Sequence, residues 1–282
     1  MKKAILSFLF VSGLLYANNT SISYEYGFKD YKNSMTKKDG NVKTVGISHK
    51  VSNHKIDLSY QGDNVIRKHS ISNVNLKSLD VEKYSIKYNY KINDSFALKT
   101  SYIKIIDNLA PTDQGKVYGL GGAYQFSKAL STSLSAYKSD YQDFDVKQYD
   151  FAISKSFKIE DIKLKATAIA KKIDIDGKTY GNYLFKDKDY FTTGIKFAAN
   201  YQGYVAGVGA FFGERIFTVL DDGTKVQHHA MQQDKTYMLS FGKKFKDFDI
   251  IAKYSFQNGK ELPENRDDVD TKVMAIALTY KF

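Results

Sequence analysis

Hydrophobic and polar residues alternate with a period of two along most of this chain. Near its beginning, the apolar residues Ile22, Tyr24, Tyr26 and Phe28 alternate with Ser23, Glu25, Gly27 and Lys29. Such alternation is expected of β-strands that bury one face. Its recurrence predicts about fourteen strands, with about twelve or sixteen as alternatives, each roughly the 9 to 11 residues that a tilted strand needs to cross a bilayer.

The segments between these strands are of two alternating kinds. Links of two to four residues, spelled SNH, ND, SKA, KIED, NYQG and KD, join paired strands. The other connections are long and polar, and they cover residues 30–43, 61–80, 106–116, 138–147, 172–188, 214–235 and 257–271. The pattern predicts an all-β, transmembrane up-and-down antiparallel β-barrel with short periplasmic turns, long extracellular loops and both chain ends on the periplasmic side. It does not decide whether 61–80 or 214–235, the longest loops, fold inward.

A soluble β-sandwich would also alternate in this way, with its apolar face inside. Closure argues against the sandwich, because about fourteen strands in one open sheet would leave exposed edges. A barrel this wide is too large for side chains to fill, so its interior is expected to be wet. We therefore expect apolar residues outside and polar residues inside.

The composition agrees with a strand-rich membrane protein. The chain holds 22 Tyr and 19 Phe but only 2 Pro, and aromatic residues suit pleated surfaces whereas proline cannot donate to a ladder. The negative mean hydropathy does not exclude a barrel, in which only alternate residues face lipid. Cysteine is absent, so the fold holds together without disulfides.

The first seventeen residues, MKKAILSFLFVSGLLYA, have the layout of a secretory signal peptide. Two lysines precede an apolar run that is too short for a membrane-spanning helix, and Ala17 suits the cleavage site. An N-terminal anchor helix is the alternative. We predict a signal peptide over 1–17 and a barrel domain over 18–282. Losing Lys2 and Lys3 lowers the formal charge from +11 to +9.

The end of the chain, MAIALTYKF, places Met274, Ile276, Leu278, Tyr280 and Phe282 at every second position. This ending resembles the C-terminal signal of Gram-negative outer-membrane β-barrel proteins. The resemblance implies that the barrel-assembly machinery reads Tyr280 and Phe282, and that the chain lies in the cell outer membrane among lipid and lipopolysaccharide. The alternative is that both are ordinary interfacial aromatics.

In size and strand number the chain is similar to the fourteen-strand monomeric porins, although no motif aligns residue by residue. That resemblance implies a porin-like channel for passive diffusion of small hydrophilic solutes or ions. The first predicted strand begins at about Ser21, which leaves no room for an N-terminal plug domain.

The predicted inward register supplies more basic than acidic side chains, so a mild anion preference is expected. The expected pore-lining residues are Lys50, Lys87, Lys99, Lys163, Lys165, Lys196, Lys244, Lys253, Glu25, Asp57, Asp150 and Asp249. Alternatively, the lysines pair with these carboxylates. Small residues on the same register are expected to leave the bore clear or, as an alternative, to relieve crowding: Gly119, Gly121, Gly207, Gly209, Ser131, Ser133 and Ser135.

Two other function classes stay open. One is a structural or adhesive barrel without an open pore. The other is an outer-membrane protease or lipid hydrolase, whose candidate residues are Asp221, Asp222, His228 and His229 in one loop, where an acid and a histidine would activate water. No second cluster faces this loop, so we expect no enzyme, catalytic residue, metal site or cofactor.

Charge elsewhere in the chain adds little. The basic residues are spread along strands, which disfavours a nucleic-acid partner. Acidic residues gather in one loop, where they are expected to be solvated or, alternatively, to bind divalent cations that bridge lipopolysaccharide: Glu261, Glu264, Asp267, Asp268 and Asp270.

Overall fold

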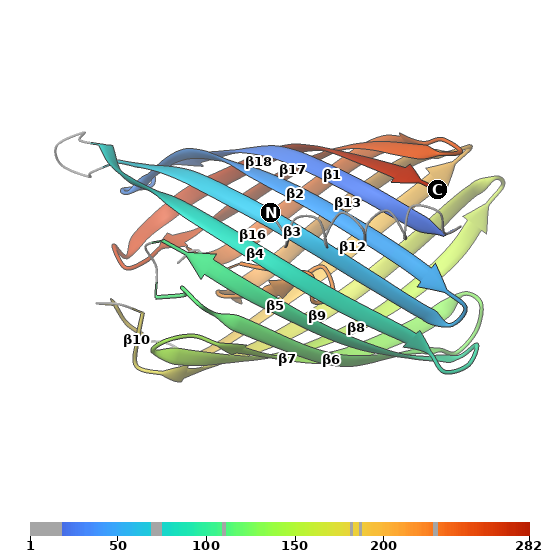
Figure 1. Ribbon diagram of the computed structural model, residues 1–282, viewed down its shortest axis with the longest axis horizontal. Helices are drawn as coiled ribbons and strands as arrows, with labels where there is room; N and C mark the ends of the chain where they lie inside the picture. The colour runs from blue at the N-terminus through green and yellow to red at the C-terminus, as the bar shows by residue number, and fades with distance from the viewer. Residues whose placement is uncertain (1–18, 69–74, 109–110, 181–182, 186–187, 228–230) are drawn as a thin grey trace, which may run out of the picture.

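A computed structural model describes residues 19–68, 75–108, 111–180, 183–185, 188–227 and 231–282. In these residues, fourteen antiparallel strands form one closed barrel in which each strand pairs with its neighbours in the chain (Figure 1). The predicted fold class and strand number are therefore confirmed. Among the described residues no helix is long and apolar enough to cross a membrane.

The barrel strands are 10 to 17 residues long. In chain order they are β1 (Thr20–Lys32), β2 (Lys37–Val51), β3 (His54–Lys68), β4 (Asn75–Lys91), β5 (Phe96–Asp107), β6 (Lys116–Gln125), β7 (Leu130–Asp140), β8 (Phe144–Ile159), β9 (Ile162–Gly177), β12 (Asp189–Tyr201), β13 (Tyr204–Arg215), β16 (Met231–Lys244), β17 (Phe248–Glu261) and β18 (Arg266–Lys281). Two short hairpins lie outside this sheet, β10 (Thr179–Tyr180) with β11 (Tyr183–Leu184) and β14 (Val219–Leu220) with β15 (Lys225–Val226).

The barrel closes between its first and last strands. β1 pairs with β18 from Ser21 opposite Lys281 to Lys32 opposite Asp270, and the backbone N–H of Phe282 donates to the carbonyl of Thr20 at 2.9 Å. A sheet closed in this way has no free edge on which other chains could pair. The alternating terminus therefore completes the barrel wall.

Short turns gather at one end of the barrel, on the right in Figure 1, which we call the turn end; the opposite end is the loop end. The turn between β12 and β13 consists of Gln202 and Gly203, whose φ angles of 48° and 84° are both left-handed. Such two-residue turns match the twist of the flanking strands. Outer-membrane barrels keep their short turns on the periplasmic side.

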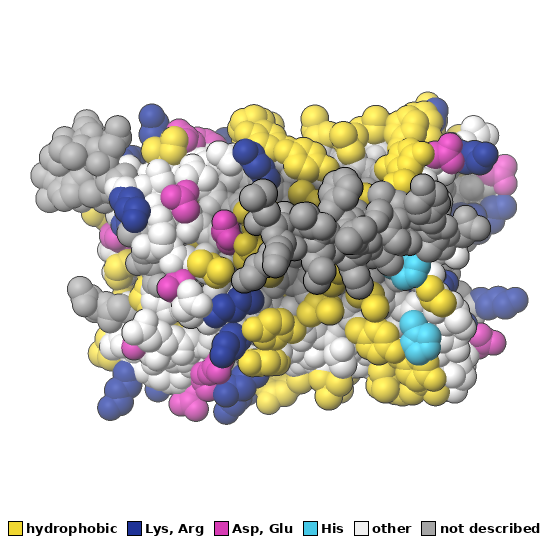
Figure 2. Space-filling model, in the orientation of Figure 1, with side chains coloured by type: hydrophobic (Ala, Val, Ile, Leu, Met, Phe, Trp, Pro, Cys, Tyr) yellow, Lys and Arg dark blue, Asp and Glu magenta, His cyan; other side chains and the backbone are white. Residues whose placement is uncertain are grey.

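An apolar belt surrounds the outside of the barrel. The outward side chains of Phe28, Leu134 and Phe241 are each more than 60% exposed, as no globular core would leave them. In Figure 2 hydrophobic side chains predominate over the visible surface between the two ends, while charged and other polar side chains dominate the loop end and also rim the turn end. Aromatic pairs mark the turn end, among them Phe245 stacked on Phe248 with ring centroids 4.4 Å apart. Such a belt suits burial in hydrocarbon with an aromatic girdle at its margin.

The strands run further toward the loop end than the alternation predicted. Segments expected to be loops over 30–43, 138–147 and 257–271 contract to connections over 33–36, 141–143 and 262–265. Those loop boundaries were wrong because the strand extensions have left the membrane. Without lipid on one side, nothing imposes an apolar outward face on them. The longest connections that the structure describes in part are 178–188 and 216–230.

Candidate functional site

Ion pairs between strands that are not neighbours identify the inward face of the barrel. Lys29 on β1 reaches Asp63 on β3 at 2.5 Å, across β2. Lys253 on β17 reaches Glu25 on β1 at 2.5 Å, across β18. Only side chains that point into the lumen can meet in this way, so their alternate positions define the inner wall.

The strand pairing places all twelve residues expected to line a pore on this inner face. Lys165 and Lys171, for example, lie an even number of residues apart on β9, so their side chains share one face of the sheet. Lys171 bonds Asp150 on that face. Several of the twelve also contact one another or the hairpin described below: Lys253 bonds Glu25, while Lys87 and Lys99 share Asp222. Others pair with acids or bases that the sequence did not single out, as Asp57 does with Lys55 at 2.8 Å and Asp249 with Lys281 at 2.6 Å.

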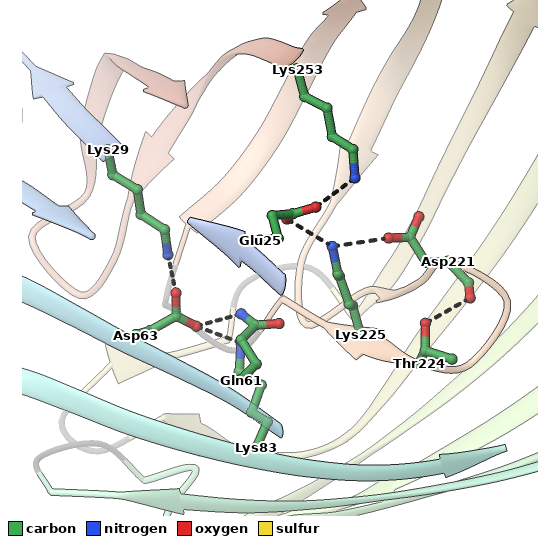
Figure 3. A network of polar contacts seen from close by, with 9 residues as sticks. All are labelled: Glu25, Lys29, Gln61, Asp63, Lys83, Asp221, Thr224, Lys225 and Lys253. Carbon is green, nitrogen blue, oxygen red and sulfur yellow. Dashed lines mark hydrogen bonds and ion pairs between the residues drawn. The ribbon is translucent and has the colours of Figure 1, made fainter. Parts of the chain in front are cut away.

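A group of ion pairs lies on the inner face of the barrel near β1 and β3 (Figure 3). Asp63 accepts hydrogen bonds from Lys29, Gln61 and Lys83 at 2.5, 2.7 and 2.9 Å. Glu25 holds Lys253, and it also holds Lys225 from the β14–β15 hairpin at 3.4 Å. The barrel wall and the hairpin thus share one charged network.

The β14–β15 hairpin lies inside the barrel. Gln148 on β8 fixes it from one side, because its amide oxygen accepts from the N–H of Val219 at 2.8 Å and its amide nitrogen donates to the Val219 carbonyl at 2.9 Å. At the tip, Asp222 bonds Lys87 and Lys99 on β4 and β5 at 2.7 and 2.9 Å. The hairpin therefore crosses the lumen from β13 and β16 to the opposite wall.

The geometry of the hairpin tip explains its glycine. Asp221, Asp222 and Gly223 all have left-handed φ angles, of 49°, 58° and 89°. A side chain at Gly223 would also overlap Ser101 on β5 and approach the ring of Tyr137 on β7. Glycine tolerates both the left-handed conformation and the close approach to the barrel wall.

An apolar cluster fills the lumen around this hairpin toward the loop end. Phe217 is fully buried, and its ring centroid lies 4.8 Å from that of Phe144 and 5.5 Å from that of Tyr180. Phe185, beside the β10–β11 hairpin, packs against Phe144 at 5.3 Å. Residues of two loops and the inner wall together make a hydrophobic core inside the barrel.

This core corrects the expectation that the whole interior is wet. Side chains cannot fill so wide a barrel from its wall alone, but two inserted loops supply the missing volume. The expectation that small residues keep the bore clear is also wrong at Gly119, where a Cβ atom would overlap Ser101 and the ring of Tyr137. There the glycine makes room for Tyr137, which is 6% exposed.

Open space remains at the turn end and beside the hairpin. Two hollows of about 510 and 620 Å³ lie against opposite walls at the turn end. A smaller hollow of about 140 Å³ lies between the hairpin and the wall of β1, β16, β17 and β18, where Lys29, Gln233 and Gln257 line it with Leu220. In this conformation the lumen is wide and polar at the turn end and narrow at the loop end.

The charge at the hairpin tip is held in its ionised form. Burial by itself raises the pKa of the Asp222 carboxyl, but the hydrogen bonds and positive charges of Lys87 and Lys99 outweigh burial. The pKa of Asp222 therefore lies below its ordinary range. The ion pairs that hold the tip are formed at neutral pH.

Of the four residues proposed for an enzyme alternative, the structure describes the two acids. Asp221 and Asp222 bond lysines, at 3.4 Å to Lys225 and 2.7 Å to Lys87, and His228 and His229 lie outside the described residues. Within the described part of the chain, no group of three or more His, Cys, Asp or Glu side chains could hold a metal ion. The predicted signal peptide, 1–17, also lies outside the described residues.

The acidic loop was expected to be solvated, and for Glu261 this is wrong. Its side chain is fully buried, where it accepts from Ser34, Thr36, the Met35 N–H and Lys37, the last at 2.8 Å. A buried carboxylate needs such partners. Asp267 remains mostly exposed and pairs with Lys260 at 3.1 Å.

Sequence reasoning missed the residues that hold the hairpin, above all Gln148, Phe217 and Lys225. The available signal was the apolar residues Ile216, Phe217, Val219 and Leu220, interrupted only by Thr218, inside a long connection whose inward folding the sequence left undecided. An apolar run in a polar loop indicates that the loop has something to pack against.

Comparisons with known proteins agree with this architecture. No family model matches the chain, and no curated protein matches it. A bacterial polysaccharide outer membrane secretin is 10% identical, with 94% of this chain and 99% of that chain covered and a TM-score of 0.58. A Pseudomonas aeruginosa FadL homologue is 10% identical over 95% and 92% of the two chains, with a TM-score of 0.58. The Pseudomonas putida toluene transporter TodX is 9% identical over 96% and 91%, with a TM-score of 0.59.

At these identities the similarity concerns the fold. In this chain the closed barrel carries an apolar belt on its outer face, as a membrane-embedded protein requires. The chain has the fold of the outer-membrane β-barrel proteins and lies in the outer membrane.

Proposed function

We propose that this barrel is a channel for small hydrophilic solutes or ions, with a mild preference for anions, and that the β14–β15 hairpin closes it in the conformation described. The observation that carries the proposal is the polar, lysine-rich inner wall, which continues from the turn end to the hairpin tip at Lys87 and Lys99. A barrel that only anchored a surface structure would not need a hydrated inner wall. Two of the solved structures of similar fold are described as a toluene transporter and a monoaromatic hydrocarbon channel.

The anion preference follows from charges that remain uncompensated. Among the described residues, Lys163, Lys165 and Lys244 make no ion pair, whereas the inward acids Glu25, Asp150 and Asp249 each bond a lysine. A surplus of fixed positive charge in a narrow aqueous space raises the local concentration of anions.

The packed core favours a second candidate, a structural barrel that never opens. Phe217 and its neighbours bury an extended apolar surface, and such contacts resist separation. In that case the polar turn end would be a blind vestibule. The two candidates differ in whether the hairpin leaves the lumen.

The terminal aromatic residues Tyr280 and Phe282 are proposed to act in assembly of the barrel and to face lipid afterwards. The outward rings of Tyr280 and Phe282 are 52% and 42% exposed and lie edge to face, with centroids 4.9 Å apart. They are accessible to the barrel-assembly machinery on the free last strand before closure, and to outer-membrane lipid and lipopolysaccharide afterwards.

Planar-bilayer recording on the refolded, processed chain tests the proposal. We expect discrete openings whose reversal potential in a salt gradient favours anions. A barrel that stays silent at all voltages, yet has the strand content and heat-modifiable mobility of a folded barrel, would support the structural candidate instead. Openings selective for cations would contradict the role given to the lysines.

A further inference from the structure

The two hollows at the turn end have similar volumes but different charge. The larger, of about 620 Å³, lies against β8, β9, β12, β13, β16 and β17, and four lysines line it: Lys158, Lys163, Lys165 and Lys244. No acidic residue lines this hollow. The lysines therefore face space without a fixed counter-charge.

Their neighbours do not neutralise these lysines. Lys163, Lys165 and Lys244 make no ion pair with any described residue, and Lys158 has only Asp161, at 3.1 Å, where both side chains are mostly exposed. Asp249 is opposite Lys244 in the sheet but bonds Lys281 at 2.6 Å. The positive charge of this wall is thus available to a solute.

The register brings like charges together here. Lys158 on β8 lies directly opposite Lys163 on β9, an arrangement that destabilises a sheet. A bound anion between two such ammonium groups would remove the repulsion. The cross-strand pair of lysines therefore favours a negative group that bridges both ammonium groups.

Small and apolar residues form the floor of the hollow. The row that starts at Lys165 continues through Ala198, Gly207 and Ser240 on the next three strands. Val205 and Ile251 add apolar surface beside this row. The hollow therefore combines several cations with room and apolar contact for a carbon skeleton, which a simple inorganic ion would leave unused.

The opposite hollow, of about 510 Å³, lacks this combination. Its Lys55 pairs with Asp57 at 2.8 Å, and its Lys91 pairs with Asp94 at 2.6 Å. Lys50 is the one lysine lining this hollow that makes no ion pair with a described residue, against three such lysines in the larger hollow. Both hollows lie at the turn end. If anions were only attracted to this end of the barrel in general, lysines of both hollows would contribute equally to anion binding.

We propose that the lysine-lined hollow of β8 to β17 is a binding site for small organic polyanions that carry two or more carboxylates. This inference rests on the proposed function and names the solute class of the channel, because a solute that binds at the turn end would be one that the channel conducts. Several ammonium groups around one hollow bind a polycarboxylate through several charge-assisted hydrogen bonds at once. A monocarboxylate of similar size would engage fewer of them.

Isothermal titration calorimetry on the refolded chain in a non-ionic detergent tests the site without requiring conduction. Citrate is titrated at constant ionic strength into the wild type, the double variant Lys163→Gln and Lys165→Gln, and a control with Lys55→Gln and Lys91→Gln. Heat-modifiable mobility verifies that each variant is folded. We expect the test variant to weaken citrate binding about tenfold, because each lost cation removes a partly exposed ion pair, and the control to change it less than about twofold.

The outcomes separate the site from the channel. Citrate that binds a silent barrel would keep the site and refute the channel, whereas a conducting barrel without citrate heat would refute the site alone. Equal weakening in both variants would overturn the proposal in favour of diffuse attraction. Inorganic phosphate that binds as tightly as citrate would overturn the assignment to organic polyanions.

Discussion

Replacing Phe217 by alanine should release the hairpin that closes the barrel. Phe217 is fully buried and lies among the rings of Tyr141, Phe144, Tyr180 and Phe185, with centroid distances from 4.8 to 6.3 Å. Its φ angle of 51° is left-handed and unfavourable for an aromatic residue. The packing of its ring therefore compensates for backbone strain in the inserted conformation.

The magnitude follows from the cost of emptying a packed aromatic site. Phe-to-Ala substitutions in cores cost about 3–5 kcal/mol, and we take the lower end, about 3 kcal/mol, because the surrounding rings can relax. When the hairpin leaves the lumen, Phe217 loses these contacts in the wild type but the alanine has none to lose. Since about 1.4 kcal/mol is a factor of ten, the ratio of open to closed barrels should rise about a hundredfold.

Single-channel recording of the refolded variant measures this ratio directly as open probability. Phe212→Ala is the matched control, because Phe212 lies five residues earlier, on β13, but points outward and is 48% exposed. We expect Phe217→Ala to open far more often than the wild type and Phe212→Ala to behave like it. If Phe217→Ala folds and its open probability equals that of the control, the apolar cluster is not what holds the barrel closed.

Three further changes probe other contacts. Asp222→Asn removes two partly exposed ion pairs worth about 1 kcal/mol together, so open probability should rise about fivefold, much less than for Phe217→Ala. Because the inserted hairpin holds the pKa of Asp222 below its ordinary value, ion-pair stabilisation is present above about pH 4 and is lost as pH falls through the depressed pKa. Wild-type openings should therefore increase under acid, and a response of equal size in Asp222→Asn would exclude this carboxyl as its source. Glu261→Gln leaves Lys37 buried without a counter-charge and should cost about 3–5 kcal/mol, seen as a lower temperature of heat modification, while Asp267→Asn at an exposed pair should change it little. Phe282→Ser should reduce the folded barrel recovered from outer membranes while leaving refolding in detergent unchanged, and equal recovery would remove the targeting role of the terminal ring.

The membrane-facing half of the fold could be predicted from the sequence because lipid imposes a strict rule. Every second residue of a membrane-spanning strand faces hydrocarbon and must be apolar. The apolar residues Tyr24, Ile86 and Leu239 therefore mark their strands and the outward direction of their side chains. The short turns follow from the same alternation. The closure of the sheet through the terminal strand follows from the need to leave no edge.

The loop end and the plug could not be predicted in the same way. Beyond the membrane the outward face becomes polar, so alternation fades although the strands continue, as β4 does for 17 residues. The hairpin is held by pairs that are far apart in the chain, such as Gln148 with Val219, which are 71 residues apart. Local patterns carry no information on such pairs, and only the apolar run from Ile216 to Leu220 signals that this loop is buried.

The inner wall could be predicted from the sequence only in its register, not in its ion pairs. Alternation fixes the inward register, so Lys87, Lys99 and Lys253 could be placed on the inner face without knowledge of their partners. Whether a lysine is compensated depends on the strand beyond its neighbour or on the inserted loop. Lys99 and Lys163 have similar sequence surroundings. In the fold Lys99 pairs with Asp222, whereas Lys163 makes no ion pair with the described residues.

In the proposed channel an aqueous route runs through the barrel, and the inserted hairpin blocks it. The most direct test of this claim is the single-channel conductance of a variant in which residues 217–227 are replaced by a short glycine and serine turn. We predict stable openings, larger and longer than those of the wild type, with a reversal potential that favours anions. A folded variant that lacks the hairpin and still passes no current would contradict the claim, because the barrel would then have no continuous route to close.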